Sequence, residues 1–201
     1  MPRGPRVDND ELLSAGLDLM KQNGKPLKKR TGFGRSMFYD SPNGETVRVR
    51  TCNDHILIVL SDQHSGDATL NIEGTDWLLI VMPEIERTPG KVRAYLVPTS
   101  VACDAVRRTH QAWLDTSPNT KGSNTTWNVW FSAYGPAKAN NFEAHWKQYL
   151  LPGNADTTNI ASESDASDSS VRTEVETARM RISKAAGVPP SAVKISIDFA
   201  I

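Results

Sequence analysis

The sixteen residues SMFYDSPNGETVRVRT, at positions 36–51, decide the fold that the chain is expected to adopt. Their first run ends at Asp40, and SPNG at 41–44 is typical of a tight turn, because proline fixes φ and Asn-Gly tolerates positive φ. From 45 to 51 the residues alternate, with valines on one side and Arg48 and Arg50 on the other. A period of two is typical of a half-buried strand. The stretch therefore predicts a β-hairpin with one apolar and one basic face.

Helices and further strands surround this hairpin. Before it, Asp8 and Glu11 form a capping box ahead of leucines at helical spacing. After it, the runs 55–60, 76–82 and 92–97 predict strands, and 55–60 is typical of a strand covered on both faces. A helix over 99–114, a strand over 125–131 and an aromatic-faced helix over 142–150 follow. Strands grouped between helices predict an α+β fold with a mixed central β-sheet flanked by helices.

Composition divides the chain into four segments: a flexible arm at 1–7, an α+β core domain at 8–151, a disordered linker at 152–170 and a C-terminal helix-strand tail at 171–201. The linker is rich in Ser, Asp, Asn and Thr and holds too little apolar material to offset ordering entropy. One helix and one strand cannot close a core alone. The tail is therefore expected to dock on the core, pair with a second copy or bind a protein partner.

The charges balance, with 23 Lys+Arg and 23 Asp+Glu in 201 residues. This excludes a strongly basic chain but leaves room for a local basic face. The longest apolar runs are shorter than the ~18 residues of a membrane span, and the first residues lack the apolar stretch of a secretion signal. Two cysteines form neither a disulfide framework nor a zinc signature. These observations predict a cytoplasmic protein with no membrane partner.

Cations gather at the front of the chain, where the first fifty residues hold ten Lys or Arg and six Asp or Glu. A patch of this kind neutralises backbone phosphates and gives affinity that falls with salt. An ordinary solvated surface explains the same charges, and both interpretations stay open. Trp130, on the strand face opposite Trp127, is a further candidate contact for a base. The candidate nucleic-acid-binding residues are Lys28, Lys29, Arg30, Arg35, Arg48 and Arg50.

The order of elements over residues 8–115 resembles the restriction-endonuclease-like (PD-(D/E)XK) nucleases: a helix, a strand ending in Asp40, a turn, an alternating strand, buried strands, and a strand that leads through proline into a helix. In that family acidic residues hold one or two Mg²⁺ ions that activate water, and a lysine assists. The resemblance places Asp40 at the first metal-binding position, Arg48 at the second acidic position and Arg50 at the lysine. Glu11 matches the helix carboxylate that some members use.

Arginine departs from the family pattern at two of these positions. Arg48 supplies no oxygen ligand and repels Mg²⁺, and Arg50 is a poor proton-transfer group because it stays charged. We therefore expect a nucleic-acid-binding protein with a degenerate nuclease site and no cofactor, in which Asp40 and Arg50 are the candidate catalytic residues. Two alternatives stay open. One is an active nuclease with Glu11 and Asp40 as Mg²⁺ ligands, and the other is a protein-interaction or homodimerising module that uses residues 171–201.

Overall fold

The computed structural model describes residues 5–30, 38–64, 67–116, 125–131 and 142–157, all within the part of the chain that ends at Thr158. The tail at 171–201 and most of the linker lie outside the described residues. The elements, in chain order, are α1 (Asn9–Gln22), β1 (Lys28–Lys29), β2 (Phe38–Asp40), β3 (Thr46–Thr51), β4 (Ile56–Leu60), β5 (Trp77–Pro83), β6 (Lys91–Pro98), α2 (Thr99–Thr116), β7 (Thr126–Trp130), α3 (Phe142–His145), the 3₁₀ helix η2 (Lys147–Tyr149) and β8 (Ala155–Asp156).

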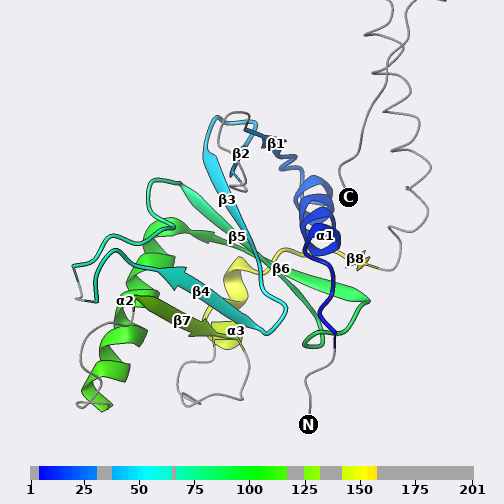
Figure 1. The fold of residues 1–201 in the computed structure, drawn as a ribbon. Coiled ribbons are helices and arrows are strands. Elements are labelled where there is room, and N and C mark those ends of the chain that lie inside the picture. Colours follow the sequence, from blue (N-terminus) through cyan, green and yellow to red (C-terminus); the bar gives the residue numbers. More distant parts are fainter. Residues whose placement is uncertain (1–4, 31–37, 65–66, 117–124, 132–141, 158–201) are drawn as a thin grey trace, which may run out of the picture. The chain divides into compact units, whose positions relative to one another are not determined.

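Most of the described strands form one mixed sheet. Its order is β1-β2-β3-β5-β6-β8, and β4 and β7 pair separately as an antiparallel ribbon (Figure 1). β2 and β3 are the predicted hairpin, with Phe38 opposite Arg48. β3 and β5 run parallel, with Val47 opposite Trp77, while the other pairs of the long sheet are antiparallel. The predicted α+β class with a mixed central sheet is confirmed.

Helix α1 covers one face of the long sheet and lies beside β3, β5 and β6 in Figure 1. The Asp8 side chain caps it by accepting hydrogen bonds from the backbone N–H groups of its first turn. The buried face of α1 joins the valines of β3 in one apolar cluster. The helix approaches the sheet closely at Gly16, where a Cβ atom would lie 2.4 Å from Cγ2 of Val81.

The ribbon of β4 and β7 packs with α2 against the other face of β5 and β6. Leu57 and Val59 of β4 are buried in this cluster. The expectation that this strand is covered on both faces is wrong, because Ile58 and Leu60 are 45% and 49% exposed. The reason is that β4 pairs with β7 outside the long sheet. Only the face of β4 that carries Leu57 and Val59 packs against the long sheet.

The chain continues to pair with the core beyond residue 151. β8 adds to the edge of β6, with Ala155 opposite Val92, and the Asn23 side chain donates a hydrogen bond to the backbone oxygen of Pro152 at 2.7 Å. Residues 152–157 were expected to begin the disordered linker, and their backbone groups instead bond to the core. The aromatic helix expected over 142–150 is also shorter, because α3 ends at His145 and η2 follows.

Candidate functional site

Four cationic side chains share one face of the sheet at its β1–β2–β3 end. The valines of β3 pack under α1, and side chains alternate between faces, so Arg48 and Arg50 project from the face turned away from α1. Directly paired residues project to the same face, and the register with Asp40 places Lys28 there too. Arg30 reaches the same face, because its Nε lies 3.0 Å from Oδ1 of Asp40. We call Lys28, Arg30, Arg48 and Arg50 the basic strip.

Two of the predicted binding residues are not placed in the basic strip. Lys29 lies opposite Tyr39 in the register, and Tyr39 is buried in the cluster beneath α1. Lys29 therefore projects from the opposite face of the sheet. Arg35 lies outside the described residues. The sequence alone did not separate Lys28 from Lys29, because the register of the short strand β1 is set by its pairing with β2.

Arg48 is held in place by an aromatic ring. The centre of its guanidinium group lies 5.0 Å from the ring centroid of Phe38, its partner across the hairpin. Partial burial, with a smaller contribution from the neighbouring charge of Arg50, lowers the pKa of Arg48 below its ordinary value. An arginine starts from so high a pKa that it stays protonated at neutral pH. The Arg48 guanidinium is therefore a cation that lies over the Phe38 ring and stays charged at neutral pH.

Arg50 links the long sheet to the ribbon. Its Nη2 donates a hydrogen bond of 2.7 Å to the backbone oxygen of Ile58 in β4. Among the ion pairs that the described residues form with one another, none contains Lys28, Arg48 or Arg50. The positive charge of these three groups is thus left uncompensated by a close carboxylate in the described part of the chain.

The carboxylates of the expected metal site are not brought together. Asp40 projects from the strip face and pairs with Arg30, whereas Glu11 belongs to the first turn of α1 on the opposite face. No cluster of three or more His, Cys, Asp or Glu suited to a metal ion occurs in the described parts of the chain. The role of Asp40 that the structure shows is to neutralise one member of the basic strip.

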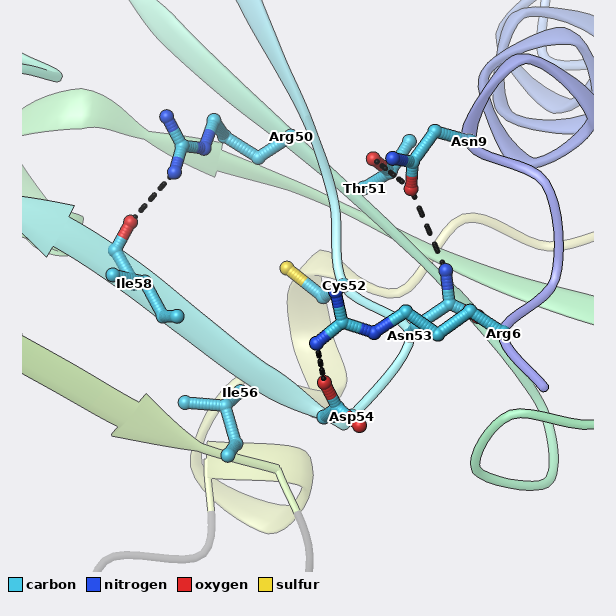
Figure 2. A pocket seen from close by; sticks show the side chains of 9 residues that line it. All are labelled: Arg6, Asn9, Arg50, Thr51, Cys52, Asn53, Asp54, Ile56 and Ile58. Carbon is cyan, nitrogen blue, oxygen red and sulfur yellow. Dashed lines mark hydrogen bonds and ion pairs between the residues drawn. The ribbon is translucent and has the colours of Figure 1, made fainter. Parts of the chain in front are cut away.

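A pocket of about 180 Å³ adjoins the strip where β3 ends (Figure 2). Arg50 enters from β3, Arg6 comes from the segment before α1, Asn9 is the first residue of α1, and the turn between β3 and β4 supplies further lining residues. Sequence reasoning found Arg50 but missed Arg6 and Asn9, because each lies more than forty positions before Arg50 in the chain. The full lining is Arg6, Asn9, Arg50, Thr51, Cys52, Asn53, Asp54, Ile56 and Ile58.

A reciprocal pair of hydrogen bonds fixes the segment before α1 to this turn. The Asn53 side chain accepts from the backbone N–H of Val7 at 2.9 Å and donates to the backbone oxygen of Val7 at 2.9 Å. Val7 is buried, with 4% of its surface exposed, although the sequence places it in a flexible arm. The turn itself requires an unusual conformation, since His55 at its end has a φ of 52°. Together these features hold Arg6 over the pocket.

The acidic group of the pocket is compensated. Asp54 accepts hydrogen bonds from Arg6 at 2.8 Å and from Arg87. Partial burial alone would raise the pKa of Asp54, but the bonds from Arg87 and Arg6 outweigh it and hold the pKa below its usual range. Burial raises the pKa of the Cys52 thiol to about 12. At neutral pH the thiol is therefore uncharged and the carboxylate is paired with two cations.

Comparison of the chain with protein-family models, curated proteins and solved structures yields no match. The resemblance to restriction-endonuclease-like nucleases therefore stays a hypothesis drawn from the order of elements. In the described part of the chain, none of the helices is both long and apolar enough to cross a membrane.

Proposed function

We propose that this protein binds nucleic acid by contacting backbone phosphates with the basic strip, and that it does not cut its ligand with Mg²⁺. The observation that carries the proposal is the gathering of four cations on one face of the sheet, two from β1 and the residue after it and two from β3. The chain as a whole is neutral, so this face is a local feature rather than a consequence of general basicity.

The spacing of the strip suits a repeating polyanion. Arg48 and Arg50 are two residues apart along β3, or about 6.6 Å, and Lys28 lies two strands away, at about 4.8 Å per strand. Cations spaced over such a surface contact successive phosphates of a nucleic-acid strand and release the counterions bound to those phosphates. Because phosphate contacts carry no base information, this surface serves DNA and RNA alike.

Apolar and aromatic side chains lie on the outward side of the ribbon to which Arg50 of the strip is bonded. Trp130 of β7 pairs with Ile56 of β4 on the outward side of the ribbon and is partly exposed, as the alternation of its strand predicts. The exposed Ile58 is joined to Arg50 through its backbone oxygen. Bases of an unpaired strand stack on such surfaces, which supports a single-stranded ligand.

The proposal is tested with two neighbouring lysines. Lys28→Glu and Lys29→Glu introduce the same charge change at two exposed positions of one strand, on opposite faces of the sheet. At an ionic strength of about 0.15 M, screening acts over about 8 Å. We expect Lys28→Glu to weaken binding of a fluorescently labelled oligonucleotide about tenfold in an anisotropy titration, and Lys29→Glu to weaken it less than about twofold.

Equal losses in the two variants, or no binding by the natural chain at low salt, would contradict the proposal. Cleavage is measured on the same material. We expect plasmid DNA to stay intact with Mg²⁺ or Mn²⁺, because the resemblance to the nucleases implies an arginine, Arg48, in place of an acidic ligand, and because Asp40 pairs with Arg30. Cleavage that Asp40→Ala abolishes would instead favour the active nuclease. The cytoplasmic location and the protein-interaction role of residues 171–201 stay predictions.

A further inference from the structure

The pocket beside the strip holds more hydrogen-bond donors than its own acceptors use. The Arg50 guanidinium carries five N–H donors, and its bond to Ile58 is the one it makes within the described part of the chain. Arg6 gives one nitrogen to Asp54 and is otherwise exposed, with 65% of its side chain accessible. Both groups reach the pocket from different elements, as Figure 2 shows. The pocket is therefore built to receive acceptor oxygens.

Asn9 adds a donor whose direction is fixed by its neighbours. Its Oδ1 accepts a hydrogen bond from the Thr51 hydroxyl at 3.1 Å and from the Asn53 amide at 3.4 Å. Because the oxygen is used in this way, the Nδ2 amide group is left available, and it has no acceptor among the described residues. Asn9 lines the pocket between Arg6 and Thr51. Its amide is thus a neutral donor oriented by the hydrogen bonds from Thr51 and Asn53.

The local charge also favours an anion. Arg6 and Arg50 line the pocket, and the carboxylate of Asp54 in its lining is shared between Arg6 and Arg87. The remaining lining groups are neutral, since the Cys52 thiol is buried and protonated at neutral pH. The apolar side chains of Ile56 and Ile58 form one wall. An anionic group that is attached to a partly apolar group fits a pocket with arginine donors and an isoleucine wall.

We infer that this pocket binds a terminal phosphate of the nucleic-acid strand that lies along the basic strip, with Arg50, Asn9 and Arg6 as donors and Ile56 and Ile58 against the terminal nucleoside. The inference rests on the proposed function. Arg50 belongs to both the strip and the pocket, so a strand on the strip leads into the pocket. A terminal phosphate presents three acceptor oxygens and a charge of about −1.5 to −2, more than an internal phosphodiester offers to these convergent donors.

The experiment compares one labelled oligonucleotide in three forms: with a 5′-phosphate, with a 3′-phosphate and without a terminal phosphate. We expect one of the phosphorylated forms to bind the full chain about tenfold more tightly than the unphosphorylated form, as charge-assisted hydrogen bonds require. Equal affinities of the three forms, with the Lys28→Glu and Lys29→Glu contrast intact, would overturn the pocket assignment and leave the proposed function standing.

Asn9→Asp is the decisive variant. Aspartate keeps an oxygen for Thr51 and Asn53 and suits the first turn of a helix, so the fold is retained, but it replaces the available donor by a negatively charged acceptor. We expect the preference for the phosphorylated end to disappear. Asn154→Asp makes the same charge change near the β6–β8 edge of the sheet, and it should retain the preference. A preference that survives Asn9→Asp would overturn the assignment.

Small phosphate compounds test whether the pocket binds a free phosphate compound or the terminal phosphate of a nucleic-acid strand. Inorganic phosphate and a nucleoside monophosphate are added to the full chain in a thermal unfolding experiment, with Asn9→Asp as control. Stabilisation that depends on Asn9, without oligonucleotide binding, would assign the pocket to a free phosphate compound and would overturn both the strand-terminal assignment and the proposed function. Stabilisation by the mononucleotide together with tighter binding of a phosphorylated oligonucleotide supports the terminal assignment.

Discussion

His110 shows how one buried titratable side chain couples stability to pH. Its ring stacks on Trp127, with ring centroids 4.0 Å apart and an interplanar angle of 9°, and its Nε2 lies 3.3 Å from the backbone oxygen of His64. Burial lowers the pKa of His110, and the hydrogen bond with His64 offsets this in part. The native protein therefore binds this proton less readily than the unfolded chain, whose histidine titrates near 6.5.

The sign of the pH dependence follows from this difference. The contribution of His110 to the free energy of unfolding is fully present above the unfolded pKa and is lost as the pH falls below about 6.5. We expect His110→Phe, which keeps a ring against Trp127, to lose less stability than the natural chain between about pH 7.5 and about pH 5.5. Urea unfolding at both values measures this, and an equal loss in the two proteins would contradict the prediction.

The strip residues show the limits of sequence reasoning at the same scale. Alternation along β3 predicts that Arg48 and Arg50 share a face, and the register confirms it. Nothing local to Lys28 and Lys29 says which of them joins the arginines, because this depends on pairing with β2. Arg6 and Asn9 carry no motif of their own, and their role follows from the bonds that Asn53 makes to Val7.

At the scale of elements, α1 meets the sheet through the glycine at position 16. A Cβ atom there would lie 2.4 Å from the Val81 side chain of β5. Alanine is the better helix former by about 1 kcal/mol, yet overpacking costs about 1–3 kcal/mol. We therefore expect Gly16→Ala to lower the free energy of unfolding by about 1 kcal/mol or more, measured by urea denaturation.

Asp18 supplies the matched control, since it is exposed on the same helix. Asp18→Ala gains helix propensity without a steric cost and should leave stability within about 0.5 kcal/mol of the natural chain or raise it. If Gly16→Ala proved as stable as Asp18→Ala, the close helix–sheet approach would be contradicted.

Strand β4 illustrates what an apolar run cannot reveal. The residues of ILIVL at 56–60 are all apolar, so the pattern has no period and predicts cover on both faces. The structure covers one face, because β4 pairs with β7, more than sixty residues later, instead of joining the sheet beside β3. The β2–β3 hairpin was predictable because its turn and its alternation lie within sixteen consecutive residues.

At the scale of the whole molecule, neutrality makes the salt dependence of binding informative. The chain carries no excess charge to attract a polyanion from a distance, so the salt sensitivity should report the basic strip. Each phosphate neutralised on a single strand contributes a slope of about −0.7 to a plot of log affinity against log salt. Because Asp40 already neutralises Arg30, the three remaining cations of the basic strip predict a slope of about −2.

Removal of one cation from the basic strip should make the slope of log affinity against log salt shallower by the contribution of one phosphate contact. We expect Lys28→Ala to make it shallower by about 0.7 and Lys29→Ala to leave it unchanged, as measured by anisotropy titrations between about 0.05 and about 0.3 M salt. Affinity that is independent of salt would show that phosphate contacts do not hold the ligand. A slope changed equally by both variants would contradict the separation of the two faces.

The sequence by itself determined the α+β class, the first helix with its Asp8 cap and the hairpin that carries Arg48 and Arg50, because capping, turn chemistry and side-chain period act between near neighbours along the chain. The tertiary structure alone decided that β3 pairs in parallel with β5, that β4 turns to β7, and that Arg6 and Asn9 meet Arg50 around one pocket. These pairings depend on which apolar faces pack together and which buried polar groups form hydrogen bonds between segments that are far apart in the sequence. Contacts of this kind produce no periodic pattern in the residues that make them.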